Sequence, residues 1–306
     1  MQPLRGILFK VSSVAVFMIM ASLIKATADS VPPGQAVFFR SFFAMPIILG
    51  WLAMRRELRN GWKTQKPFGH LWRGILGTIA MGLGFTGLAL LPLPEVTALG
   101  YAAPLIVVII AAVYLKEPVG VVRLSAVALG LVGVLIVISP RLSLGAKMNS
   151  TETLGVIVVL CGAMTVAMVQ VLVRKLVRTE STATIVFWFT VTSTIMSLLT
   201  LPWGWVVPSW DVAALLVLAG LLGGVGQMLV TTSYRHAEAS LIAPFDYTSM
   251  LLALFIGYFV FSEVPTTPML IGASLVIAAG ILVVLRERHL GLQRARQRAV
   301  TGKFGG

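Results

Sequence analysis

The chain has 306 residues, of which 11% are charged and 58% are hydrophobic, and its mean hydropathy is +0.94. Because roughly a quarter of the residues of a soluble protein are charged, this composition excludes an ordinary soluble domain. The net charge of +13 is not the mark of a nucleic-acid partner. The positive residues cluster in short loops and at the C-terminus, where membrane topology places them, so we expect no nucleic-acid partner.

Apolar runs long enough to cross a bilayer recur almost to the end of the chain. A spanning helix needs about 20 mostly apolar residues. The first run is too long for the apolar part of a signal peptide, so we expect it to remain as a helix. Pro residues at or between the run ends mark the boundaries, because a missing N–H does least harm there. We expect ten spans, at 7–27, 34–54, 71–90, 95–115, 120–139, 153–174, 182–202, 212–233, 240–261 and 267–286.

The positive charges predict how these spans are oriented, because Lys and Arg are enriched in cytoplasmic loops. With the N-terminus assigned to the cytoplasm, the cytoplasmic segments hold 20 Lys and Arg residues, and the outer loops hold only Arg141 and Lys147. The remaining two, Lys25 and Arg40, fall inside spans. If one span were missing or two were merged, the later loops would be assigned to the opposite side of the membrane, and this difference in Lys and Arg counts would be lost. The sequence therefore predicts an all-α membrane protein of ten spans with both termini in the cytoplasm.

The two halves of the chain carry matching residues. Tyr101 precedes Glu117 by sixteen residues, and Tyr247 precedes Glu263 by the same interval. A Pro and then a Gly-containing span follow each Glu, and the third and eighth spans are both rich in glycine. We expect a first five-helix repeat at 1–139, a linker at 140–152, a second repeat at 153–286 and a basic cytoplasmic tail at 287–306.

An odd number of spans in each repeat has a geometric consequence. If the first repeat enters the membrane from the cytoplasm, the second enters from outside, so the repeats are inverted. Inverted repeats are typical of secondary transporters, whose substrate site lies near the midplane at the repeat interface. Rocking of the two halves about that site gives alternating access.

Several short patterns occur in a fixed order along the chain. Lys25 lies late in the first span, and Arg40 lies early in the second. The remaining patterns are Leu-Lys-Glu-Pro at 115–118, Ala-Pro-Phe-Asp-Tyr at 243–247, Phe-Ser-Glu-Val-Pro at 261–265 and Ile-Gly-Ala-Ser-Leu-Val-Ile-Ala-Ala-Gly at 271–280. With these patterns, nearly the whole chain resembles the drug/metabolite transporter superfamily, specifically proteins with two EamA domains.

This resemblance implies a secondary transporter of small organic solutes in the bacterial inner membrane. Family members with a similar ninth span resemble bacterial carriers of riboflavin, S-adenosylmethionine and amino acids. Riboflavin is therefore the leading substrate expectation, and amino acids and S-adenosylmethionine-like solutes are the alternatives. The direction of transport and its coupling to protons are left open.

Ionisable groups inside spans are the first candidates for function, because burying them costs several kcal/mol unless they are paired or hydrated. Arg40 has small residues one turn away on either side, so it is expected to face inward, where it can bind a carboxylate, phosphate or ring oxygen of a substrate. Lys25 lies at a similar depth and is a second substrate-binding candidate. For both side chains the alternative is that they extend to the outer interface.

Asp246 is the acid that lies well inside a span, two residues after Pro244, which frees a backbone carbonyl and can kink the helix. It is a candidate for proton or cation coupling, or for binding a substrate amine; the alternative is a static carboxyl that stabilises the kink. Aromatic and amide side chains in neighbouring spans are further substrate-binding candidates. These are Tyr101, Trp188, Tyr247 and Gln227.

Other residues of the repeated pattern are expected to be structural. Glu117 with Pro118, and Glu263, lie at span ends, where we expect the carboxylates to bind loop amides or to cap the next helix. Gly280 belongs to the small-residue pattern of the tenth span.

The sequence excludes the common signatures of an enzyme or an ATP-driven pump. It contains no His-Glu-x-x-His, no Gly-x-Ser-x-Gly and no Walker phosphate loop. All three histidines fall in expected cytoplasmic segments, so we expect no metal site and no cofactor. The expected partners are a small-molecule metabolite and the lipid bilayer, and a homodimer is left open. A structural membrane protein is the non-transport alternative, but it would not need inverted repeats or intramembrane Asp and Arg residues.

Overall fold

The computed structural model describes residues 3–56, 58, 62–113, 121–141, 150–176, 179–236 and 242–301, and every regular element among them is helical. Two residues expected to be structural, Glu117 and Pro118, lie outside these ranges. Seven helices are long and apolar enough to cross a membrane, and three shorter apolar helices bring the number of spans in the described part of the chain to ten. The structure therefore confirms the all-α fold class.

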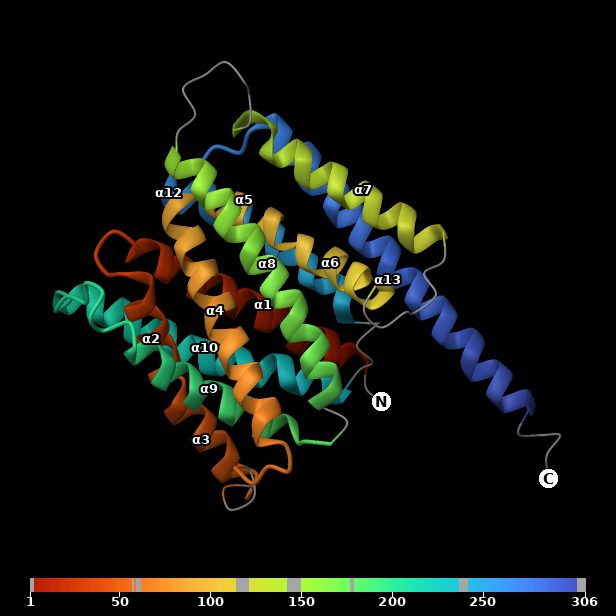
Figure 1. Cartoon of the computed structure of the whole chain (residues 1–306), viewed down its shortest axis with the longest axis horizontal. Helices are drawn as coiled ribbons and strands as arrows, with labels where there is room; N and C mark the ends of the chain where they lie inside the picture. The colour runs from red at the N-terminus through yellow and green to blue at the C-terminus, as the bar shows by residue number, and fades with distance from the viewer. Residues whose placement is uncertain are drawn as a thin grey trace.

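The ten spans form a bundle in which three spans are built from two helical pieces each (Figure 1). In chain order they are α1 (Pro3–Ala26), α2 (Pro33–Phe42) with α3 (Met45–Met54), α4 (Pro67–Leu90), α5 (Leu93–Gly100) with α6 (Ala102–Val113), α7 (Val121–Ile138), α8 (Ser150–Leu176), α9 (Thr182–Leu198), α10 (Trp210–His236), η2 (Ala243–Tyr247) with α12 (Thr248–Phe261), and α13 (Thr267–Thr301).

Proline explains the interruptions, which the continuous spans expected from hydropathy did not include. A Pro inside a helix has no N–H to donate and its ring collides with the carbonyl four residues earlier. Helix α2 ends at Phe42, four residues before Pro46, and α5 ends at Gly100, four residues before Pro104. The ninth span begins as the short 3-10 helix η2, which contains Pro244.

The main helix pairs between the two halves of the chain map onto one another when the halves are exchanged. The first span packs on the eighth (α1 on α10), and the third packs on the sixth (α4 on α8). The second, fourth and fifth spans pack on their counterparts in the other half, through α2 and α9, α5 and α12, and α7 and α13. A two-fold relation between the halves generates this set of pairs.

The pair of α7 and α13 shows how closely the halves approach, and the two helices run side by side in Figure 1. A Cβ atom at Gly133 would lie 2.7 Å from the carbonyl oxygen of Gly272, and one at Gly272 would collide with the carbonyl oxygen of Gly133. Only glycine lets the two backbones touch in this way. Helix α13 then continues to Thr301, past the expected end of its span at residue 286.

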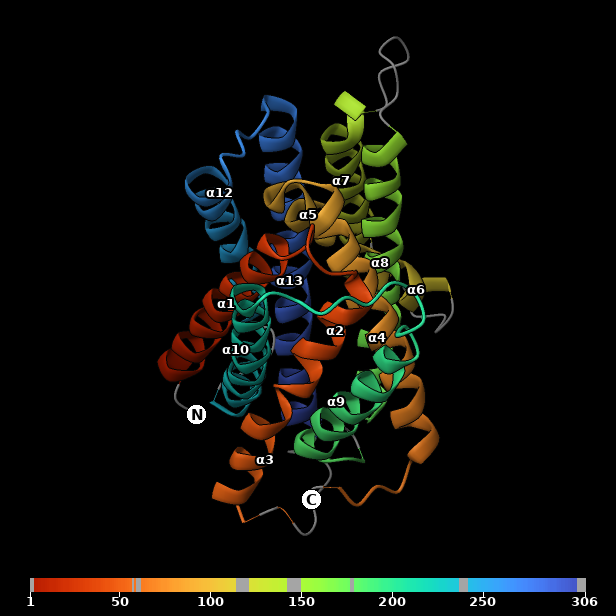
Figure 2. The same ribbon diagram turned by 90° about the vertical axis from the view of Figure 1, so that its left-hand side faces the viewer.

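The chain ends share one side of the bundle. The starts of α1 and α4 and the ends of α3 and α13 all lie in the lower half of Figure 2. At this side Glu180, between α8 and α9, fixes the segment that leads into α4. Its Oε1 accepts hydrogen bonds from the Thr64 hydroxyl (2.9 Å) and from the N–H groups of Gln65 (2.8 Å) and Lys66 (3.0 Å), and its Oε2 lies 3.7 Å from Nε2 of His70.

The environment of Glu180 shifts its pKa. Desolvation by burial raises the pKa of this carboxyl, but the hydrogen bonds from Thr64 and Gln65, the positive field of His70 and the bond from Lys66 outweigh it. The pKa of Glu180 is therefore lowered below its ordinary value. A carboxylate with a lowered pKa stabilises the folded state above the pKa it has in the unfolded chain, and this contribution is lost as the pH falls through the folded pKa.

Replacing Glu180 with Gln should lower the midpoint of thermal unfolding in detergent at pH 7 by about 3–6 °C, because hydrogen bonds to a charged group contribute about 1.5–3 kcal/mol. The deficit relative to the unsubstituted protein should shrink as the pH falls below about 4.3, the ordinary pKa of Glu, and should disappear as the pH falls through the lowered pKa of the native carboxyl. Asp29→Asn is the matched control, because Asp29 is an exposed carboxylate. A Glu180→Gln deficit equally large at pH 3 and pH 7 would contradict this account.

Candidate functional site

Two arginines from different spans lie against one phenylalanine inside the bundle. The guanidinium carbon of Arg40, on α2, lies 5.8 Å from the centre of the Phe189 ring, and that of Arg73, on α4, lies 4.1 Å from it. Both distances are within the range of a cation–π interaction. Phe189, on α9, is 6% exposed and Arg40 is 7% exposed, so Arg40 faces inward and does not extend to an interface.

Arg73 is a residue that sequence reasoning assigned to a cytoplasmic segment. In the structure its side chain leans toward the middle of α4, because Nη1 occupies the space that a Cβ atom at Gly77 would need. An arginine that reached for the nearer membrane interface would lean the other way, toward the start of the helix at Pro67. The sequence signal that was missed is the glycine one turn after Arg73, which makes room for a guanidinium inside the bundle.

Neither guanidinium meets an acid in the described part of the chain. The buried Nε and Nη1 atoms of Arg73 have no hydrogen-bond partner. The ion pairs found there join Lys10 with Asp246, Lys25 with Glu263, and His70 with Glu180, and none includes Arg40 or Arg73. An uncompensated charge inside a membrane protein is costly and is the usual mark of a substrate or ion pathway.

Polar side chains surround the arginines on two more helices. The hydroxyls of Thr78, on α4, and Ser193, one turn after Phe189 on α9, are 2.8 Å apart. Gly223, on α10, packs beside Arg40, since a Cβ atom there would lie 3.1 Å from its Nε. Gln227 follows Gly223 by one turn and is half-buried, so the expected amide lies on the helix face that meets Arg40.

Trp188 lies apart from this cluster. Its indole Nε1 donates a hydrogen bond to the backbone oxygen of Trp62 (2.9 Å), in the segment between α3 and α4, and its ring packs edge-on against Phe187. Adjacent residues on an α-helix point about 100° apart, so Trp188 faces the connecting segment while Phe189 faces the arginines. The ring that meets the arginines is thus that of Phe189, and the substrate-binding role of Trp188 stays a prediction.

Lys25 uses all its donors within the protein. Its Nζ lies 2.9 Å from Oε1 of Glu263 and donates to the backbone oxygens of Leu88 (3.1 Å) and Leu91 (2.8 Å), at the end of α4. The other oxygen of Glu263 accepts the N–H of Leu93 (2.9 Å). Because an ammonium has three donors, none remains for a substrate in this conformation. Lys25 instead holds α1, the α4–α5 junction and the end of α12 together.

Asp246 forms an ion pair with Lys10, which the charge count assigned to the cytoplasmic side. Oδ1 of Asp246 lies 2.7 Å from Nζ of Lys10; the lysine side chain is 4% exposed and the aspartate side chain is 50% exposed. The pair joins α1 to η2. The lysine side chain is therefore buried, while half of the aspartate side chain is exposed.

Tyr101 and Tyr247 pack edge to face, with ring centres 5.0 Å apart. The Tyr101 hydroxyl is within hydrogen-bond distance of the Ser249 hydroxyl, 2.5 Å away, and the Tyr247 hydroxyl occupies the space that a Cβ atom at Gly280 would need. Both expected aromatics thus lie beside Asp246, at the interface of the fourth, ninth and tenth spans, and Gly280 makes room for one of them.

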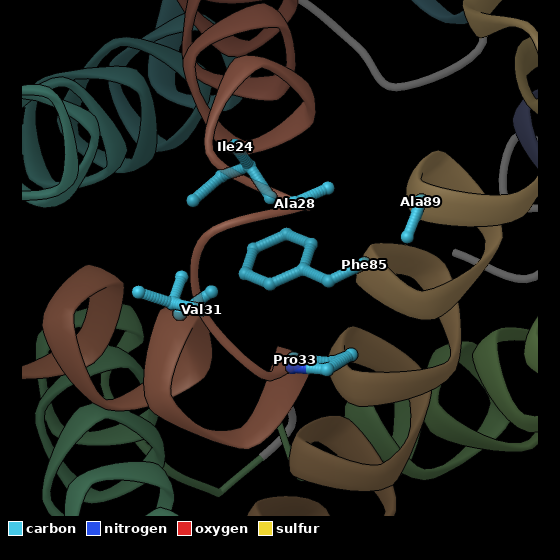
Figure 3. Close-up of a pocket in the computed structure, with 7 residues that line it drawn as sticks. Ile24, Ala28, Val31, Pro33, Phe85 and Ala89 are labelled. Atoms are coloured by element: carbon cyan, nitrogen blue, oxygen red, sulfur yellow. The ribbon is translucent and has the colours of Figure 1, made fainter. Parts of the chain in front are cut away.

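A small apolar pocket lies between α1, α2 and α4. Figure 3 shows the ring of Phe85 directed at the connection between α1 and α2. Ligand sites are commonly 300–1,000 Å³ and include a few polar groups. This space is smaller and wholly apolar in its lining, so we do not assign the site to it; it is lined by Ile24, Ala28, Val31, Pro33, Ala36, Phe85 and Ala89.

Known proteins resemble this chain over most of its length. An S-adenosylmethionine uptake transporter of Rickettsia bellii is 25% identical over 288 residues, which cover 91% of this chain and 96% of the relative. A riboflavin transporter of Rhizobium johnstonii is 30% identical over 266 residues, covering 84% and 82%. A pseudopaline exporter of Pseudomonas aeruginosa is 26% identical over 284 residues, covering 92% and 93%.

The fold and a family model agree with these relatives. A solved crystal structure superposes with a TM-score of 0.64 over 93% of this chain and 98% of its own, at 17% identity, and so shares the fold. The model of the EamA-like transporter family matches twice, at residues 4–139 and 153–285. The matched residues cover nearly the whole chain. With ten apolar spans and charged groups inside the bundle, the chain belongs to the EamA-like transporter family.

Proposed function

We propose that the protein is a secondary transporter that moves a small organic metabolite across the bacterial inner membrane by alternating access, with both termini in the cytoplasm. The observation that carries the proposal is that the main helix pairs between the halves map onto one another when the halves are exchanged, around an interior that holds two arginines without acidic partners among the described residues. Exchange of conformation between two related halves opens one site to each side in turn. The placement of the chain ends in Figure 2 agrees with this orientation.

Riboflavin is the leading substrate candidate, and S-adenosylmethionine-like solutes and amino acids are the alternatives. The riboflavin transporter has the higher identity, and the S-adenosylmethionine uptake transporter matches a larger share of the chain. Riboflavin and S-adenosylmethionine both combine a flat ring system with several polar groups. The interior offers cations, hydroxyls and an amide to such a molecule, which supports a substrate of this kind.

Two ion pairs tie the first span to the ninth at opposite ends. Lys10 and Lys25 are fifteen residues apart on α1, about 22 Å along the helix axis. Lys10 pairs with Asp246 at the start of the ninth span, and Lys25 pairs with Glu263 just after its end. The Lys25 pair has additional backbone partners and is largely buried, whereas Asp246 is half-exposed. In the proposed cycle the Lys10–Asp246 pair is the one that opens.

Protonation of Asp246 couples this opening to a proton gradient. A neutral carboxyl no longer attracts Lys10 electrostatically, so η2 is released from α1, and loss of the proton restores the pair. Because η2 also carries Tyr247, which packs on Tyr101 and on α13, its movement displaces the contact between the halves.

Purified protein reconstituted in liposomes should show saturable flux of at least one of labelled riboflavin, S-adenosylmethionine or an aromatic amino acid, above that of protein-free liposomes. Flux of S-adenosylmethionine without flux of riboflavin would replace the first candidate with the second. A folded protein that moves none of them would overturn the transport proposal for these substrate classes.

Asp246→Asn should reduce accumulation driven by a proton gradient at least about tenfold, because the driving force acts only through a group that changes protonation. Exchange of labelled for unlabelled substrate at equal pH should persist. Glu263→Gln is the matched control: it breaks the other ion pair, so it should lower the thermal unfolding midpoint but leave the dependence on the gradient intact. If Asp246→Asn still accumulates substrate in response to the gradient, the coupling role is wrong.

A further inference from the structure

Two cations share one aromatic ring in the interior, and no described anion compensates either of them. The guanidiniums of Arg40 and Arg73 both lie within 6 Å of the centre of the Phe189 ring. We infer that Arg40 and Arg73 together bind a carboxylate of the transported molecule, with the guanidinium of Arg73 as a hydrogen-bond donor to it. The inference rests on the proposed transport function, because it takes the bound molecule to be the one that the protein transports.

The unsatisfied atoms of Arg73 define the geometry of this site. Nε and Nη1 are both buried and lack partners among the described residues. Each of these N–H groups can donate a charge-assisted hydrogen bond to a carboxylate oxygen. Phe189 contacts the guanidinium through its ring, and the Nε and Nη1 donors are left without partners among the described residues.

The glycines of the third and eighth spans give both arginines their places. A Cβ atom at Gly77 would collide with Nη1 of Arg73 and lie 2.7 Å from the Phe189 ring. A Cβ atom at Gly223 would lie 3.1 Å from Nε of Arg40. The two glycine-rich spans therefore do more than allow close helix packing, because at these positions they leave room for charged side chains between α2, α4, α9 and α10.

Like charges so close together repel, and burial removes the water that would screen them. A carboxylate bound between them supplies the missing counter-charge and two acceptor atoms. It follows that the arginines destabilise the ligand-free protein and stabilise the complex. This combination separates a binding role from a structural one, since removing a structural arginine would destabilise the ligand-free protein.

The inference is tested with paired ligands that differ by one carboxylate: S-adenosylmethionine against its decarboxylated form, and tryptophan against tryptamine. The rise in the thermal unfolding midpoint of the purified protein in detergent gives the affinity of each ligand. In the unsubstituted protein, loss of the carboxylate should weaken binding at least about tenfold for the pair that binds. In Arg73→Gln this difference should fall to about threefold or less, while Arg73→Lys should recover part of it.

Arg5→Gln is the matched control, because it removes the same charge from an exposed position at the start of α1 and should leave the carboxylate preference intact. Without ligand, Arg73→Gln should unfold at a temperature no lower than that of the unsubstituted protein. Inorganic phosphate is the competing anion, and it should not displace the bound carboxylate ligand at equal concentration.

The outcomes distinguish failure of the carboxylate site from failure of the proposed transport function. No stabilisation by either carboxylate ligand, an unchanged carboxylate preference in Arg73→Gln, or a ligand-free Arg73→Gln protein that unfolds several degrees lower would overturn the carboxylate site. Riboflavin flux with normal affinity in Arg73→Gln would also overturn it, while leaving transport intact. Binding without flux in liposomes would overturn the transport function and keep the carboxylate site.

Discussion

A charge inside a bilayer costs several kcal/mol unless another group compensates it. The interior of this protein contains lysines, arginines and acids, so the arrangement of its helices depends on where each charge finds a partner. Lys25 and Lys10 find acids on the ninth span, and these pairs fix the first span at two depths. Arg40 and Arg73 find an aromatic ring instead. Compensated charges thus hold the helices together, and the uncompensated ones distinguish one region of the interior from the rest.

Small residues and prolines make this arrangement of charges possible. Glycines allow α7 and α13 to meet backbone to backbone, and they leave room for guanidiniums against α4 and α10. Prolines interrupt the second and fourth spans and begin the ninth as a 3-10 helix. A broken helix exposes backbone carbonyls that an intact helix would bond internally, and neighbouring groups must satisfy them. The bundle is therefore least regular in the second, fourth and ninth spans.

Hydropathy predicts the number of spans because each span needs its own apolar run, and ten runs were present. It does not predict the breaks at Pro46 and Pro104, because a window of spanning length averages over a single proline. The charge rule places Arg73 in a loop since the rule counts residues and ignores which way a side chain leans. Ion pairs such as Lys10 with Asp246 join residues far apart in sequence, and no local pattern encodes them. The direction in which a helical side chain points is also hard to predict from sequence. Trp188 faces the segment between α3 and α4, while its neighbour Phe189 faces the arginines.

The contact between Gly133 and Gly272 has a consequence for how the halves move. Two backbones in direct contact cannot slide apart by adjusting side chains, so in the proposed rocking motion this crossing would act as the pivot. Helices α7 and α13 pack mainly on each other and on the fourth span, away from α2 and α9. In a rocking motion, displacement is smallest at the pivot and grows with distance from it. A small rotation at the contact between Gly133 and Gly272 would thus produce the largest movements in the helices that hold the arginines.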